Sequence, residues 1–422
     1  MNNRNIYKHK LHNITMVSKY DVFYVVATKG TIKVSQIAEN LNKPKNEYQN
    51  IFNKVLELER EGFVQRKDTI EIVHTKKSKE LFNLISFCVH NLMNYNLLFK
   101  KSMLRFLQLA SKKEFFTIKN VPFHPQTFHF YITALEKYGF LFISSKNPLK
   151  CKLLRHHFLI ALMKFFGRKT IFYSLKRRSF VEEIKKELSV YNKNLKINYV
   201  VLRGAERRRE AGFIYSSLSL EGNPLTLPET QKLILENIIP EKHKFVHIQE
   251  VGNYTSAVDL MIKNSEKKIE LTVELILKYH SMAMLHIPEA GKIRGQNVFI
   301  RLNENFKTCD WKLIPQRINV LIKKYNTFES EKRSVEEVIT FASFFHNEFQ
   351  RIHPFIDGNS RISRLLMLHI LRSHNIPILD LPIGYSDQYL DLTKRSSKRD
   401  EKSFKNLIEE IVFINLRRLN RF

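Results

Sequence analysis

The spacing of apolar residues along the chain predicts a mainly helical fold. Apolar side chains recur at three and four residues at Ala211, Ile214, Tyr215 and Leu218. The same spacing runs from Ile362 to Ile370. This period is that of one face of an α-helix. Short β-prone runs lie between such stretches, so strands are expected to be a minor part of the fold.

The first 160 residues contain one pattern twice. Residues 58–64 (LEREGFV) are echoed 77 residues later by residues 135–141 (LEKYGFL). In each copy two helical stretches precede a glycine and two β-prone runs. This order resembles a winged helix-turn-helix. We therefore expect two such α+β domains at residues 1–80 and 90–160, a linker helix at 161–200 and a helical domain at 201–422.

Positive charge is concentrated in the same half of the chain. The net charge is +29, and residues 1–200 hold 36 Lys and Arg against 14 Asp and Glu, whereas residues 201–422 hold 34 against 27. The first half is therefore +22 and the second +7. A domain with such a basic balance favours polyanions, so we expect duplex DNA as a partner of residues 1–160.

The second helix of the first copy offers side chains suited to base edges and phosphates. They are Lys45, Asn46, Gln49, Asn50 and Lys54. Winged helices also serve as protein-docking and dimerisation modules. Contact with a partner protein or with a second copy of the chain stays an alternative to DNA.

Cysteines and apolar windows point to a cytoplasmic protein. The three cysteines, Cys88, Cys151 and Cys309, are widely spaced and indicate neither disulfides nor a zinc site. The first residues are polar, so no signal peptide is expected. No apolar window reaches the roughly 20 residues of a membrane span.

The richest chemistry lies in residues 353–361, HPFIDGNSR, with Arg364 three residues further on. His353 can accept a proton near neutral pH, and Asp357 is a hard oxygen ligand suited to Mg²⁺. Gly358 allows close approach to a phosphate, and the helix that follows directs its first N–H groups at an anion. These groups together suit a nucleoside triphosphate. His346, two helical turns earlier, is interpreted as a structural core histidine.

This run resembles the signature of Fic-domain proteins, His-x-Phe-x-Asp/Glu-Gly-Asn-Gly-Arg with a second Arg after it. Most characterised members transfer AMP from ATP to a protein hydroxyl. The resemblance implies that His353 is the general base and Asp357 the Mg²⁺ ligand. It implies that Asn359 contacts the α-phosphate and that Arg361 and Arg364 contact the outer phosphates. Phe355 would point into the core.

Ser360 departs from the signature, which usually has Gly there. If this residue needs a positive φ, Ser is strained by about 1–2 kcal/mol. If it lies in the helical region, the change is mild and its N–H still reaches phosphate.

A second motif lies upstream at residues 217–223, SLSLEGN. It resembles the family's inhibitory sequence, in which Ser217, Glu221 and Asn223 hold the motif positions. Gly222 is a typical end for the preceding helix, which leaves the Glu221 carboxylate in need of a cation. The resemblance implies that this cation is Arg364 and that the pair excludes the γ-phosphate. The alternative is an ordinary helix end.

Residues 290–300 resemble the family's flap, a β-hairpin over the active site. Its expected members are Gly291, Lys292, Ile293, Arg294 and Val298. An exposed strand edge there can pair with an extended target peptide. A purely structural hairpin is the alternative.

The sequence thus predicts an all-helical Fic core with a hairpin flap behind two winged helix-turn-helix-like domains. The expected function is an adenylyltransferase that uses ATP and Mg²⁺ to modify a protein hydroxyl, its own included, and is held inactive by Glu221. Two alternatives stay open. One is a DNA-binding transcriptional regulator with a nucleotide-sensing Fic-like half, and the other is a hydrolase that removes AMP from modified protein.

Overall fold

A computed structural model describes residues 17–169, 179–300, 303, 306–377 and 379–421. The chain divides into two compact units. Unit 1 comprises Met1–Thr133, Ser145–Leu153 and His157–Tyr173, and unit 2 comprises Ala134–Ser144, Leu154–His156 and Ser174–Phe422.

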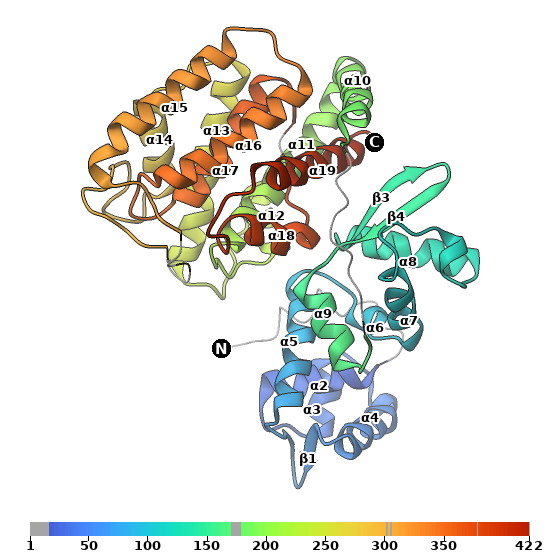
Figure 1. Ribbon diagram of the computed structural model, residues 1–422. Helices are drawn as coiled ribbons and strands as arrows, with labels where there is room; N and C mark the ends of the chain where they lie inside the picture. The colour runs from blue at the N-terminus through green and yellow to red at the C-terminus, as the bar shows by residue number, and fades with distance from the viewer. Residues whose placement is uncertain (1–16, 170–178, 301–302, 304–305, 378, 422) are drawn as a thin grey trace. The chain divides into compact units, whose positions relative to one another are not determined.

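The N-terminal part of the chain alternates helices with two short hairpins (Figure 1). In chain order its elements are α2 (Lys19–Lys29), α3 (Val34–Asn40), η1 (Lys45–Glu47), α4 (Tyr48–Arg60), β1 (Val64–Arg66), β2 (Ile70–Ile72), α5 (Lys76–His90), α6 (Tyr95–Leu98), α7 (Lys101–Ala110), η2 (Ile118–Asn120), α8 (Pro125–Lys137), β3 (Leu141–Lys146), β4 (Leu149–Leu153) and α9 (His157–Phe165). The helices and strands of both copies lie where the apolar pattern puts them. Their assignment as winged helix-turn-helix domains stays a prediction.

In the first copy, a capping box starts α2, since Ser18 and Asp21 each bond the other's backbone N–H. Ile51, Val55 and Leu58 form the buried face of α4. β1 and β2 pair antiparallel with Val64 opposite Ile72. The amphipathic period alone therefore fixes which face of α4 is buried and which is solvated.

The residues predicted to meet DNA do not all share one helix, since Lys45 and Asn46 lie in η1 and only Gln49, Asn50 and Lys54 lie in α4. Asn46 and Gln49 are exposed, while Asn50 and Lys54 are half-buried. Lys54 lies 3.4 Å from Glu57. The side chain of Lys45 lies outside the described residues.

The described residues of the C-terminal part of the chain form helices joined by loops, with no strand among them. Its elements are α10 (Val181–Ile197), α11 (Tyr199–Ser219), α12 (Leu227–Glu236), α13 (Phe245–Glu266), α14 (Val273–Ala283), η3 (Trp311–Leu313), α15 (Ile314–Glu329), α16 (Val335–Ile352), α17 (Asn359–Ser373), η4 (Ile383–Tyr385), α18 (Ser386–Leu392) and α19 (Glu401–Leu419).

Helix α17 is the centre of this part (Figure 1). It packs against α16, α13 and α14, and α16 also packs against α19. Almost every residue of α17 is buried, including Arg361, Arg364 and His369. A helix buried on all sides cannot present polar groups to water, so each of these side chains needs a partner inside the protein or in a ligand.

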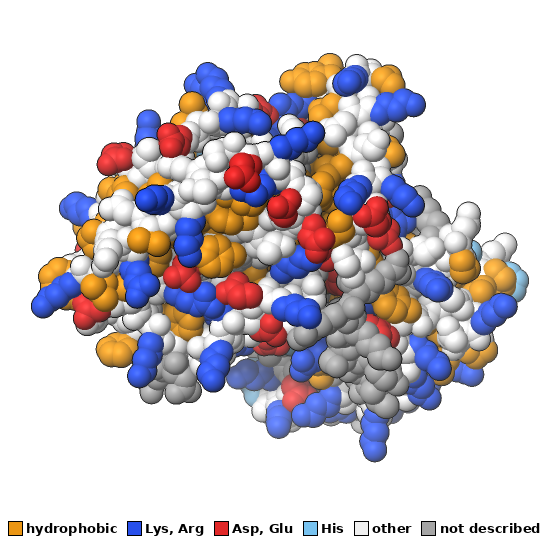
Figure 2. Space-filling view, turned by 45° about the horizontal axis from the view of Figure 1, so that its top comes forward, with side chains coloured by type: hydrophobic (Ala, Val, Ile, Leu, Met, Phe, Trp, Pro, Cys, Tyr) orange, Lys and Arg blue, Asp and Glu red, His pale blue; other side chains and the backbone are white. Residues whose placement is uncertain are grey.

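Charge is not gathered into one stripe on the face that Figure 2 shows. Basic side chains are spread over this whole face, with acidic side chains between them. None of the described helices combines the length and the apolar character needed to cross a bilayer.

Candidate functional site

The candidate site is the loop that joins α16 to α17. α16 ends where the backbone of His353 turns left-handed, with a φ of 50°, and α17 begins after Gly358, with a φ of 83°. The side chain of Asn359 closes the loop. Its Oδ1 accepts from the N–H of Phe355 at 2.9 Å, and its Nδ2 donates to the carbonyl of Phe355 at 2.8 Å. Phe355 is fully buried, so the loop is anchored in the core as expected.

His353 is held as a neutral imidazole. Burial lowers its pKa to about 4. Its Nδ1 lies 3.3 Å from the carbonyl oxygen of Gln350, and since a carbonyl only accepts, Nδ1 carries the proton. Nε2 is then left with a lone pair at neutral pH. This is the state that a general base needs before it takes a proton.

Asp357 and Arg361 form the charged part of the loop. The Oδ2 of Asp357 lies 3.0 Å from Nη2 of Arg361, and its Oδ1 accepts from the N–H of Gly358 at 2.6 Å. The Asp357 side chain is 62% exposed, so its remaining lone pairs can take a hard cation such as Mg²⁺. Arg361 is buried, and its Nε has no hydrogen-bond partner among the described atoms. A buried guanidinium donor left open fits an anionic oxygen.

Gly358 is required by both backbone and space. A Cβ at this position would lie 2.9 Å from the side chain of Met284 and 3.1 Å from Nε2 of His280. Its positive φ lets the chain enter α17 with the first N–H groups of the helix unbonded within the helix. Ser360 lies inside α17 and is not among the residues with positive φ, so the departure from the family signature is the mild one.

Arg364 is a buried cation beside the loop, held by three hydrogen bonds to the end of α11. Its Nε donates to Oγ of Ser217 at 2.8 Å, and its Nη2 donates to the Ser217 carbonyl at 2.9 Å and to Oε1 of Glu221 at 2.9 Å. The Ser217 hydroxyl in turn donates to the hydroxyl of Tyr254 at 2.9 Å, and Tyr254 donates to the carbonyl of Arg361 at 3.1 Å. The end of α11 is thereby tied to α17 through one buried network.

Glu221 follows the last turn of α11 and is one-fifth exposed. Its second oxygen, Oε2, lies 3.4 Å from Nζ of Lys394. Burial acts to raise the pKa of Glu221, but Arg364 and then Lys394 act to lower it, and the net shift is downward. The carboxylate is therefore charged at neutral pH and bridges two cations.

Asn223 holds the segment after α11 in place and forms its hydrogen bonds with residues other than Arg364. Its Nδ2 donates to Oε2 of Glu250 at 2.7 Å and to the carbonyl of His247 at 3.0 Å, and its Oδ1 accepts from the N–H of Leu225 at 3.1 Å. These bonds fasten the chain after Glu221 to α13. Among the three residues of the motif, only Ser217 and Glu221 contact the arginine.

The flap prediction was wrong in its secondary structure. No strand is assigned over residues 281–300, so the expected hairpin is an irregular loop. Arg294 explains this, because it is buried rather than facing a target. Its backbone N–H donates to Pro354, and its guanidinium donates to the carbonyls of His353 at 2.7 Å, Gln296 at 2.6 Å and Cys309 at 2.5 Å. These bonds impose an irregular path on the segment in place of a ladder.

The other flap residues remain near the surface. Lys292 is exposed, while Gly291, Ile293 and Val298 are half-buried. The carbonyl of Val298 accepts from the Thr308 hydroxyl at 2.9 Å, so this backbone acceptor is already used.

A comparison of the sequence with known proteins finds a family match in one part of the chain. Residues 270–371 match the Fic/DOC family. This stretch contains the whole loop between α16 and α17 together with Arg364, while Glu221 lies before it. The match therefore places a Fic domain at residues 270–371.

The relatives of this Fic domain include named enzymes. Over 211 residues the chain is 28% identical to the protein adenylyltransferase Fic of Drosophila erecta and 26% identical to that of Drosophila melanogaster. Each alignment covers 50% of this chain, and 41% and 42% of the two relatives. The chain thus spans less than half the length of the curated relatives it matches.

A solved structure shares the fold. It is a Fic domain-containing signaling protein from Bacteroides thetaiotaomicron that is 19% identical to this chain, with a TM-score of 0.51. The match covers 57% of this chain and 96% of that protein. The helical Fic core predicted from the sequence is therefore confirmed.

His280 is a residue of the Fic domain that the sequence did not single out. Its Nε2 donates to the carbonyl of Asp357 at 3.0 Å, and its Nδ1 accepts from the N–H of Gly291 at 2.8 Å. Its ring stacks on Phe355 with the centroids 3.6 Å apart. His280 therefore ties the turn at Gly291 to the loop between α16 and α17. The only sequence signal was its position on the helix before the flap, which carries no chemistry by itself.

His346 is fully buried in the Fic domain, as a structural histidine would be. Its Nε2 lies 2.9 Å from the hydroxyl of Tyr389, and its ring stacks on Phe404. It thus supports the Tyr389 ring, which Arg364 faces at 5.9 Å.

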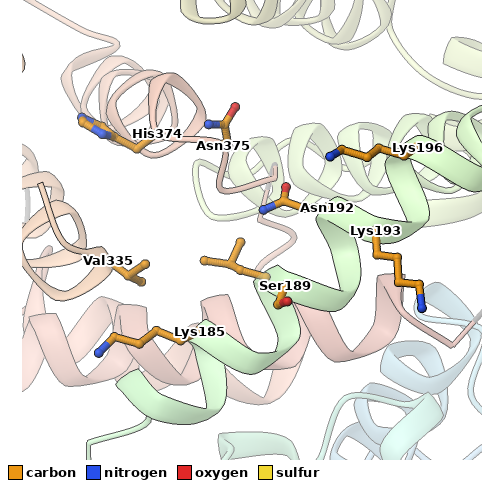
Figure 3. Close-up of a pocket in the computed structure, with 9 residues that line it drawn as sticks. Lys185, Ser189, Asn192, Lys193, Lys196, Val335, His374 and Asn375 are labelled. Atoms are coloured by element: carbon orange, nitrogen blue, oxygen red, sulfur yellow. The ribbon is translucent and has the colours of Figure 1, made fainter. Parts of the chain in front are cut away.

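An open groove of about 590 Å³ lies apart from the candidate site (Figure 3). Lysines of α10 line one side and the chain after α17 lines the other. The lining residues are Lys185, Leu188, Ser189, Asn192, Lys193, Lys196, Val335, His374 and Asn375. None of them belongs to the predicted site.

Buried neutral histidines make the stability of the Fic domain depend on pH. Burial lowers the pKa of His280, His353 and His369 to about 4 and that of His346 to about 3. In the unfolded chain these groups begin to bind protons near their ordinary pKa of about 6.5. Between these values the unfolded state binds more protons, so the free energy of unfolding falls as the pH is lowered.

We therefore expect the unfolding temperature to drop by about 5–10 °C between pH 7.5 and pH 5. Thermal unfolding of the full chain at a series of pH values measures this. The drop should be smaller in His369→Gln and unchanged in His129→Gln, since His129 is exposed on α8. If the unfolding temperature of His369→Gln depends on pH in the same way as that of the natural chain, His369 is not one of the histidines that cause the drop.

Proposed function

We propose that this chain is a protein adenylyltransferase that moves AMP from ATP to a Ser, Thr or Tyr hydroxyl of a protein. The observation that carries the proposal is the pairing of Glu221 with Arg364 beside a complete Fic loop. A buried arginine that is neutralised by a displaceable carboxylate suits a phosphate site that is switched off. The names of the relatives support the same reaction.

The loop residues account for the chemistry as follows. Nε2 of His353 takes the proton of the target hydroxyl, whose oxygen attacks the α-phosphorus of ATP. The bond from the α-phosphorus to the bridging oxygen breaks, and pyrophosphate leaves. Arg361 and the first N–H groups of α17 bind phosphate oxygens. Asp357 would hold Mg²⁺, which supplies positive charge to the phosphates when bound.

Asn359 has a supporting role in this scheme. Both polar atoms of its side chain are already bonded to the backbone of Phe355. We therefore propose that the main role of Asn359 is to maintain the shape of the loop, in preference to direct contact with the α-phosphate.

Glu221 regulates the reaction by occupying Arg364. While the pair is closed, a γ-phosphate has no cation at this position, and ATP cannot adopt the orientation that exposes its α-phosphorus to the hydroxyl. A hydrolase that removes AMP is the second candidate, because Glu221 is charged and partly exposed and so can also orient a water molecule. Incubation with labelled ATP and Mg²⁺ shows whether label enters protein. Incubation of protein that already carries labelled AMP shows whether the label is released.

The base assignment is tested by His353→Ala in the Glu221→Gly protein. We expect AMP transfer to fall by at least about a hundredfold, because proton transfer to a positioned base contributes that much. ATP binding should stay within about twofold, since the phosphate contacts lie on other residues. His129→Ala is the matched control, an exposed histidine far along the chain in α8. Full activity in His353→Ala would remove His353 from the mechanism.

The inhibitory pair is tested by a double-mutant cycle. Glu221→Gly should raise AMP transfer by about ten- to hundredfold, the value of one charge-assisted contact to phosphate. Adding Arg364→Ala should abolish the gain, so the two changes must be non-additive. Glu241→Gly, which removes an exposed carboxylate, is the control. If Glu221→Gly instead slows the release of AMP from modified protein, Glu221 is catalytic and the hydrolase is the correct function.

We also propose that the N-terminal half binds duplex DNA through α4. The full chain should bind a duplex with an affinity that falls steeply with salt, because binding releases counterions. Lys54→Ala should reduce the slope of log affinity against log salt by about one, the loss of one phosphate contact. Lys101→Ala, on α7, should leave the slope unchanged. Absence of binding at low salt would favour a protein-docking role for this half.

A further inference from the structure

Lys394 is the second cation on the inhibitory carboxylate, and no sequence motif includes it. Its Nζ lies 3.4 Å from Oε2 of Glu221, while Arg364 holds Oε1 at 2.9 Å. The two cations therefore sit on the two oxygens of one anion. Arg364 is buried, whereas Lys394 is 43% exposed, so the lysine faces the open side of the pair.

The backbone that carries Lys394 is fixed independently of Glu221. Nδ2 of Asn303, a buried residue, donates to the carbonyls of Lys394 at 2.8 Å and Ser396 at 3.0 Å. The buried Arg399 donates to the Thr393 carbonyl and lies 4.1 Å from the centre of the Phe306 ring. The ammonium group of Lys394 should therefore remain nearby when Glu221 moves away.

We propose that Lys394 is a phosphate-binding residue that, together with Arg364, receives the terminal phosphate of ATP once Glu221 has left. This proposal rests on the proposed adenylyltransferase function. A phosphate presents two or more anionic oxygens at a spacing close to that of a carboxylate, and it carries at least as much negative charge. An anion that replaces Glu221 on Arg364 thus meets Lys394 as well.

The proposal gives Lys394 opposite effects in the two states of the enzyme. With Glu221 present, Lys394 helps to hold the inhibitory carboxylate, so removal of Lys394 should strengthen the binding of ATP. With Glu221 absent, Lys394 binds the terminal phosphate, so removal of Lys394 should weaken the binding of ATP. A lysine that merely neutralised Glu221 would have no effect on ATP after Glu221 is removed.

The test measures binding of ATP and of ADP, each with Mg²⁺, by calorimetry. Every variant also carries His353→Ala, so that no AMP is transferred during the titration. In the Glu221→Gly background, Lys394→Met should weaken ATP binding by about three- to tenfold and ADP binding by less than about twofold. Lys394→Arg should retain ATP binding. In the background with Glu221, Lys394→Met should strengthen ATP binding.

Lys398→Met is the matched control, since Lys398 is an exposed lysine of the same loop. If Lys394→Met behaves like Lys398→Met in the Glu221→Gly background, the assignment of Lys394 is overturned and the proposed function stands. Equal losses for ATP and ADP also overturn it, since they would mean a general charge effect. If the Glu221→Gly protein binds neither nucleotide, the proposed function fails, and the role of Lys394 fails with it.

Discussion

The organisation of this Fic domain depends on the guanidinium of Arg364. It is buried in the centre of the helical core, on a helix that is covered on nearly every side. A buried cation that loses its anion is destabilising by several kcal/mol, so Arg364 needs an anionic partner in every state of the protein. In the structure that partner is Glu221, assisted by the hydroxyl and the carbonyl of Ser217. The proposed regulation would exchange this carboxylate for a phosphate, so that the cation has an anion in either state.

The loop beside Arg364 is held in shape by contacts within the protein itself. Asn359 bonds both backbone groups of Phe355, and the Phe355 ring is stacked on His280. His280 in turn fixes the carbonyl of Asp357 and the turn at Gly291. The segment around Gly291 and the loop between α16 and α17 therefore share one neutral histidine. Preorganisation of this kind spares the ordering of a loop at the moment of reaction.

Local patterns in the sequence predicted the helices and the loop, because the residues responsible are neighbours along the chain. The helical period identified the stretches that became α11 and α17, and the nine-residue signature identified His353, Asp357 and Arg361. His280 and Lys394 were missed because their roles come from contacts with residues distant in sequence. The prediction of a hairpin at residues 290–300 was wrong for a related reason. Val298, Phe299 and Ile300 are β-prone residues, but the tertiary bonds of the buried Arg294 override this local preference.

Ser360 is the one departure from the family signature, and its position shows which residues of the loop need a particular backbone conformation. Left-handed backbone occurs at His353 and at Gly358, and the second of these also has no room for a Cβ. Ser360 lies two residues later, inside α17, where any residue adopts the required φ. Its N–H remains among the first of the helix, which have no partner within it. A serine here therefore preserves the phosphate-facing backbone, whereas the same substitution two residues earlier, at Gly358, would meet both a positive φ and the side chain of Met284.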